Sequence, residues 1–129
     1  MKKKSLRSLK HKLDGVFSQW IRRRHATSQG DAVCVSCGAV KMWKHMHAGH
    51  YVSRVYLATR WDDRNAAVQC PTCNVLRRGN YSEYTAFMLR KYGPGIIDEL
   101  NQRKRAIVKY TIPDLENMIE AYERKLIAL

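Results

Sequence analysis

The sequence predicts an α+β fold in which a small ββα core, tied together by two cysteine pairs, lies between an N-terminal helix and a helical C-terminal part. Three observations support this prediction. Apolar residues recur every three or four positions between residues 5 and 24 and again after residue 111, as in helices that bury one face. Short alternating stretches, typical of strands, lie between them. Two Cys-x-x-Cys pairs, at residues 34–37 and 70–73, enclose these stretches.

The first predicted element is a basic amphipathic helix within residues 1–26. Its apolar face begins with Leu6 and Leu9 and continues to Trp20, with lysines and arginines between these positions. A run of three arginines closes it. The pattern is consistent with a helix that packs on the core, and equally with a helix that lies along a DNA backbone.

The predicted core covers residues 34–80. Residues 40–43 and 51–56 alternate between apolar and polar side chains, and we expect them to form a small hairpin. Pro71 suits the first residue of a helix, because proline fixes a helical φ and lacks only an amide hydrogen that would be unpaired there. We expect that helix to end at Gly79.

Residues 81–129 are predicted to be helical. One helix covers residues 81–92, a charged helix runs from 96 to about 109, and a third begins near Thr111. The third carries apolar residues on one face, namely Leu115, Met118, Ile119, Tyr122 and Leu126. This face is expected to form either an internal core or the contact of a homodimer.

The composition points to an anionic partner. The chain has 129 residues, the length of one domain, and 24 Lys and Arg against 11 Asp and Glu give a formal net charge of +13. Such an excess predicts binding to DNA, although a solvated basic surface has the same composition. No apolar run reaches the roughly 18 residues of a membrane span, and the basic start lacks the apolar block of a signal peptide. We therefore expect a cytoplasmic protein with reduced thiols and no membrane partner.

The four cysteines predict a structural Zn²⁺ site. Each Cys-x-x-Cys pair places two thiolates on one turn, and two pairs complete a tetrahedral site with no position open to water. The ligands would be Cys34, Cys37, Cys70 and Cys73. A redox pair is the alternative, but the sequence lacks the βαβ surroundings of a thioredoxin-like protein.

Polar residues inside and beside the cysteine pairs suggest hydrolysis of a phosphodiester. His50 lies between the pairs, Asn65 precedes the second pair, and Asn74 follows it directly. A neutral histidine, with an ordinary pKa of about 6.5, can take a proton from water. A divalent cation bound by Asn, Asp or His can stabilise the charge that develops on phosphate.

This order of residues resembles the HNH, or ββα-metal, nuclease superfamily. The resemblance implies that His50 is the general base, Asn65 braces the loop, and Asn74 binds a catalytic Mg²⁺ or Mn²⁺. The simpler interpretation makes His50 a polar core residue and Asn74 a helix cap.

One position departs from the superfamily pattern. Superfamily members usually carry Asp, His or Glu directly before the base, as a second metal ligand, and this chain has Gly49 there. His47 is the nearest residue that could supply the ligand, and His45 and Asp62 are the alternatives.

A longer string of motifs is similar to the lambdoid-phage NinG/Rap recombination proteins. The motifs are Cys34-Val35-Ser36-Cys37-Gly38, Ala48-Gly49-His50-Tyr51, Arg60-Trp61, Arg64-Asn65, Gln69-Cys70, Cys73-Asn74, Gly79-Asn80 and Tyr84. The resemblance covers most of the chain and implies a structure-specific endonuclease that cuts Holliday junctions and D-loops in the cytoplasm of a bacterial host. That family shares the glycine before the histidine, whereas position 47 is typically acidic in it. Longer members carry a further cysteine-bearing N-terminal segment, and the resemblance does not carry any function of that segment over to this sequence.

Arginines near the predicted site are the expected DNA contacts. They are Arg54, Arg60, Arg64, Arg77, Arg78, Arg22, Arg23 and Arg24. Such side chains neutralise phosphates without reading bases, which suits recognition of DNA shape. The alternative function is a non-catalytic zinc-finger DNA-binding module with a decayed HNH site. Both functions predict salt-dependent binding, but only the nuclease predicts cleavage.

Overall fold

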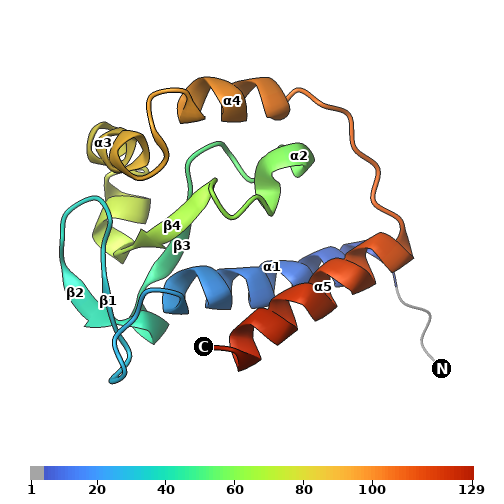
Figure 1. The fold of residues 1–129 in the computed structure, drawn as a ribbon, viewed down its shortest axis with the longest axis horizontal. Coiled ribbons are helices and arrows are strands. Elements are labelled where there is room, and N and C mark those ends of the chain that lie inside the picture. The colour runs from blue at the N-terminus through green and yellow to red at the C-terminus, as the bar shows by residue number, and fades with distance from the viewer. Residues whose placement is uncertain (1–4) are drawn as a thin grey trace.

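The structure is a computed structural model that describes residues 5–129. Helices α1 (Leu6–Arg23) and α5 (Ile112–Ile127) lie side by side and run in the same direction (Figure 1). One small sheet lies between this pair and helices α3 (Tyr81–Tyr92) and α4 (Ile96–Arg103), and a second lies beyond the C-terminal end of α1 (Figure 1). The predicted α+β class is confirmed. Within the described residues, no helix combines the length and apolar character needed to cross a membrane.

One apolar core lies between α1 and α5. The Ser5 side chain caps α1 by accepting a hydrogen bond from the Ser8 amide at 3.1 Å. Along α1 the buried residues recur every four positions, at Leu9, Leu13, Phe17 and Ile21. They pack with three buried residues of α5, namely Leu115, Ile119 and Tyr122. The predicted amphipathic helix is thus confirmed from Leu6 onward, and residues 1–4 of the predicted segment lie outside the described residues. The three α5 residues belong to an internal core.

The strands form two separate antiparallel pairs. Strand β1 (Asp31–Val33) pairs with β2 (Val40–Met42), which confirms the strand expected near residue 40. Strand β3 (His47–His50) pairs with β4 (Ala66–Gln69). All four residues of β4 are buried, because Ala66 faces the α1–α5 core and Ala67 faces a second core that includes Tyr84 of α3.

The strand predicted at residues 51–56 is wrong. After β3 the chain forms a loop that leads to the short helix α2 (Leu57–Arg60). Both backbone groups of Val52 bond to the buried Asn65 side chain, so they are not available to a neighbouring strand. The true partner strand is β4, whose burial on both faces gives an apolar run instead of the alternation used for prediction.

Two of the predicted helices are shorter in the structure. The helix expected over residues 71–79 is a single π-helical turn, η2 (Thr72–Leu76). The helix expected to reach residue 109 ends at Arg103. Beyond it Ile107 is 92% exposed, and the chain extends until Tyr110 packs edge-on against Trp61, with ring centroids 5.6 Å apart. Contact with the α1–α5 core therefore replaces the last helical turns. Helix α3 and the start of α5 agree with the predicted boundaries.

Candidate functional site

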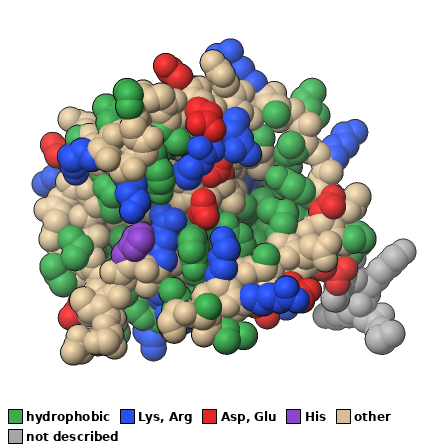
Figure 2. Space-filling view, viewed as in Figure 1, with side chains coloured by type: hydrophobic (Ala, Val, Ile, Leu, Met, Phe, Trp, Pro, Cys, Tyr) green, Lys and Arg blue, Asp and Glu red, His purple; other side chains and the backbone are tan. Residues whose placement is uncertain are grey.

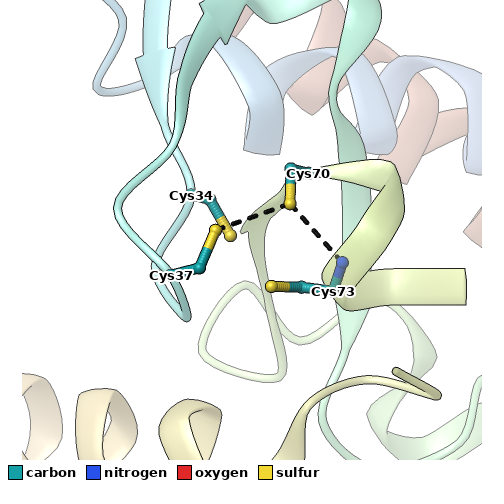
Figure 3. A group of neighbouring side chains, drawn as sticks. All are labelled: Cys34, Cys37, Cys70 and Cys73. Atoms are coloured by element: carbon teal, nitrogen blue, oxygen red, sulfur yellow. Dashed lines mark hydrogen bonds between the residues drawn. The ribbon is translucent and has the colours of Figure 1, made fainter. Parts of the chain in front are cut away.

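The four cysteine side chains converge on one point (Figure 3). All four Sγ atoms lie within 4.8 Å of one another, and those of Cys37 and Cys70 are 3.6 Å apart. A tetrahedral ZnS₄ centre with Zn–S bonds of about 2.3 Å needs sulfur–sulfur separations of about 3.8 Å. The four cysteines are free thiols, so the group can hold a zinc ion as predicted.

Local structure presents these sulfurs from two distant segments. Cys34 and Cys37 lie on the turn between β1 and β2, which is closed by a hydrogen bond from the Gly38 amide to the Cys34 carbonyl at 2.9 Å. Gly38 has φ 79°, a conformation that glycine adopts without strain. Cys70 follows β4, and Cys73 lies in η2. A zinc ion here would tie the first sheet to the end of the second.

His50, the expected general base, lies at the end of β3 beneath α1. Its Nε2 is 2.8 Å from the carbonyl oxygen of Arg60. Since a carbonyl only accepts, Nε2 carries the hydrogen and Nδ1 is the ring nitrogen able to take a proton. Burial lowers the pKa of His50, reinforced by the positive charge of Arg54, although the bond to Arg60 acts in the opposite direction. The ring is therefore neutral at pH 7.

A cavity of about 390 Å³ opens beside His50. Helix α1 forms one wall and β3 another, and the lining residues are His11, Asp14, Gly15, Phe17, Ser18, Ala48, His50 and Arg54. His11, Asp14 and Ser18 recur at three- and four-residue steps, so one face of α1 is directed at the expected base. Sequence reasoning assigned α1 to packing or DNA contact and missed this contribution.

Asp14 is the central acceptor of this wall. Its carboxylate accepts hydrogen bonds from Arg54 at 2.7 Å, from Trp61 Nε1 at 3.0 Å and from Arg60 Nε at 3.0 Å. Burial on its own would raise the pKa of Asp14, but the hydrogen bonds and charge of Arg60, with Trp61 and Arg54, bring it below 3.8. Asp14 therefore fixes the residue whose carbonyl orients His50. Its signal in the sequence was its position as the single acidic residue of α1.

Asn65, the residue expected to brace the loop, lies between α2 and β4. It is fully buried, and its Oδ1 accepts from the Val52 amide at 2.8 Å. Its Nδ2 donates to the carbonyls of Val52 and Thr59 at 3.0 and 3.1 Å. The side chain thus joins Val52, in the loop after β3, to Thr59 of α2, the residue before Arg60.

The structure places Asn74 beside His47. Nδ2 of Asn74 and Nδ1 of His47 are 3.0 Å apart. His47 and His50 are three residues apart on β3, so their side chains leave opposite faces of the strand. The two expected metal ligands, His47 and Asn74, are therefore in contact with each other. The expected base, His50, points from the other face of the strand.

Position 49 has no room for the missing ligand. A Cβ atom at Gly49 would lie 1.9 Å from Oε1 and 2.7 Å from Cδ of Gln69. Gln69 is fully buried, and its Nε2 donates to Ser36 Oγ and to the Gly79 carbonyl. Tyr84 donates its hydroxyl to the Gly49 carbonyl at 2.7 Å. The glycine is thus required by packing, and no side chain at 49 points at a metal. The alternative ligand Asp62 is paired with Arg64 and Arg103.

The arginines expected to contact DNA differ in their surroundings. Arg54 and Arg60 pair with Asp14, and Arg64 pairs with Asp62 and Glu99. Lys and Arg side chains are spread over the face shown in Figure 2, with acidic groups among them. The charges of Arg54, Arg60 and Arg64 are therefore already partly neutralised by these carboxylates.

The arginine run at the end of α1 is partly committed to the protein itself. Arg22 and Arg23 lie over the ring of Trp43, with centroid distances of 5.2 and 5.0 Å. Arg24 donates to the carbonyls of Asp63 and Ala66. Arg77 and Arg78, by contrast, are exposed, and within residues 5–129 neither has an ion-pair partner.

The fold and the cysteine site define a small basic α+β protein with a centre able to hold zinc. The chain belongs to the NinG family, because the family model described as the bacteriophage lambda NinG protein matches residues 1–129. Protein ninG of Salmonella phage P22 is 30% identical over 98 residues, which cover 74% of this chain and 47% of the relative. Protein ninG of Escherichia phage lambda is 28% identical over 97 residues, with the same coverage of 74% and 47%.

The chain spans about half the length of these curated relatives. No solved structure matches it.

Proposed function

We propose that this NinG-family chain is a metal-dependent endonuclease of the HNH, or ββα-metal, class, similar to Rap. Its substrate would be branched DNA, such as Holliday junctions and D-loops formed in phage recombination, in the cytoplasm of the bacterial host. Symmetrical cutting of a junction needs two active sites, which suits a homodimer with twofold symmetry.

The observation that carries this proposal is the environment of His50. Its Nε2 is fixed on the Arg60 carbonyl, its pKa is lowered mainly by burial, and it lines an open cavity beside the cationic Arg54. A neutral imidazole with one nitrogen fixed and the other free to accept a proton is what a general base needs. Asn65 and Asp14 act through Arg60 to hold that orientation.

His47 and Asn74 fit a catalytic Mg²⁺ or Mn²⁺. Nδ2 of Asn74 lies 3.0 Å from Nδ1 of His47. A cation held by this pair would replace that contact, with Oδ1 of Asn74 as a hard oxygen ligand and the freed Nδ1 of His47 as the second donor. Two protein donors leave the remaining positions to water and to phosphate oxygens, as is usual for Mg²⁺. Such an ion would stabilise the charge on the phosphate and on the leaving oxygen. Because His47 and His50 leave opposite faces of β3, the base and these ligands are expected to reach a phosphate around the edge of the strand.

The formal charge of +13 supports DNA as the partner. Arg77 and Arg78 are exposed close to Asn74 in the chain, where they can neutralise neighbouring phosphates. The ion-paired Arg54, Arg60 and Arg64 would contribute less, because their carboxylate partners offset their charge.

The second candidate function is a zinc-tied DNA-binding module without catalysis. The arrangement on β3 favours it, because Asn74 contacts His47, which leaves the opposite face of the strand from the expected base His50. Both candidates predict binding that weakens steeply with salt.

Cleavage separates the two candidates. Purified protein would be incubated with a labelled four-way junction, a D-loop and a linear duplex, with Mg²⁺, with Mn²⁺ or with EDTA, while zinc content is measured in parallel. The nuclease predicts junction cleavage with an added cation and none in EDTA, at constant zinc content. Tight junction binding without cutting under either cation would establish the binding module instead.

A further inference from the structure

Two apolar side chains project from the turn that follows Asn74. Val75 is 58% exposed and Leu76 is 79% exposed. Single exposed apolar residues are ordinary on a protein surface, but two in succession beside a polar site are not accounted for by the core. They belong to none of the three apolar clusters of the described residues.

The turn that presents them is held from both sides. It is a single π-helical turn, a rare element that is frequent at functional sites. The amide of Asn74 donates to the Cys70 carbonyl at 3.0 Å, and the amide of Gly79 donates to the Cys73 carbonyl at 2.9 Å. Both acceptors belong to the cysteine site, so zinc binding would stiffen the base of the turn. A rigid backbone of this kind holds an exposed side chain in place when it contacts a partner.

The rim of the turn is cationic. Arg77 and Arg78 follow Leu76 directly, and both are exposed. Tyr81 is 48% exposed and packs edge-on against Tyr51, with ring centroids 5.5 Å apart. An apolar tip with arginines behind it is complementary to an opened base step flanked by phosphates, and such wedges occur in proteins that kink DNA.

We propose that Val75 and Leu76 form a wedge that enters the branch point of DNA and separates the stacked bases there, while Arg77 and Arg78 hold the adjoining phosphates. A branch point already has a weakened stack, so insertion there costs less than in continuous duplex. The wedge deepens the proposed function, on which it rests, by giving the turn beside Asn74 the role of selecting branched over linear DNA.

The test is Leu76→Ser, with Ile107→Ser as the matched control. Both residues are apolar and highly exposed, at 79% and 92%, so neither change should disturb the fold. A forked DNA carrying 2-aminopurine at the branch would be titrated with each protein without added Mg²⁺ or Mn²⁺. Fluorescence reports unstacking of the probe base.

The wedge predicts that the wild type and Ile107→Ser raise the fluorescence and that Leu76→Ser does not. Loss of the wedge should weaken fork binding about tenfold, given the usual contribution of contacts to unstacked bases, and leave duplex binding unchanged. Equal signals from Leu76→Ser and wild type would overturn the wedge, as would equal weakening on fork and duplex. A protein that unstacks the fork but never cuts it would overturn the nuclease and leave the wedge standing. Cleavage of the fork without any fluorescence change would overturn the wedge and support the nuclease.

Discussion

The side chain of Gln69 fills the space that a side chain at Gly49 would need. Oε1 of Gln69 lies 1.9 Å from the position of a Cβ at residue 49, and its Nε2 is bonded to Ser36 and Gly79. The absence of a side chain at Gly49 thus leaves room for Gln69 to join the β1–β2 turn, through Ser36, to the turn after η2, through Gly79. Any second ligand for a catalytic metal has to come from elsewhere, and His47 is the residue that contacts Asn74.

Replacing Gly49 should therefore destabilise the fold. Gly49→Ala forces Gln69 out of a buried, doubly bonded position, so the free energy of unfolding should fall by about 1–3 kcal/mol, as for other overpacked cores. Urea denaturation would measure it. The control is Gly15→Ala on α1, where no atom lies within 4 Å of the new Cβ and the helix should gain about 0.5–1 kcal/mol. Unchanged stability of Gly49→Ala would mean that Gln69 can move freely.

Asn65 should be a structural brace whose loss is felt throughout the loop. Asn65→Ala leaves the amide and carbonyl of Val52 and the carbonyl of Thr59 without this partner, so unfolding should become easier by at least about 2 kcal/mol. Thermal and urea unfolding would measure the loss. Asn117→Ala, an exposed position on α5, should change little. Equal stability of the two variants would show that Asn65 does not brace the loop.

Zinc should be required for the native state. We expect one zinc per chain by elemental analysis, because four thiolates close a single tetrahedral site. Removing it with a strong chelator, or changing Cys73 to Ser, should abolish the cooperative thermal unfolding transition, since this centre joins the two sheets. A chain that remains folded and metal-free would exclude a structural zinc.

The sequence predicts the elements of the fold that depend on local patterns, and it misses those that depend on contacts between distant residues. The cysteine pairs and the apolar faces of α1 and α5 are local patterns, and the structure contains them. The strand β4 was missed because it is buried on both faces. Asp14 and the packing role of Gln69 were missed because their importance comes from contacts with residues far away in the chain, such as Arg60 and Gly49. Tertiary contacts of this kind leave little local signal.

Stability should fall as the pH is lowered through the titration of His50. Burial places its folded pKa below the ordinary 6.5, so between these two values the unfolded chain binds more protons than the folded chain. The stabilisation is complete above about pH 6.5 and declines below it. His25, whose pKa is also lowered, acts in the same direction. Urea midpoints between pH 5 and 8 would show the decline, and His50→Gln should make it shallower. An unaltered slope in that variant would mean that His50 titrates normally.

The most direct test of the nuclease is the single-turnover rate of four-way junction cleavage by wild type and His50→Gln. Glutamine can still donate to the Arg60 carbonyl but cannot act as a base, so the rate should fall by about 10²–10⁴-fold while junction affinity is unchanged. The acid limb of the wild-type rate should lie below pH 6.5, in accord with the lowered pKa of His50. Cleavage by His50→Gln at the wild-type rate would contradict the assignment of His50 as the base.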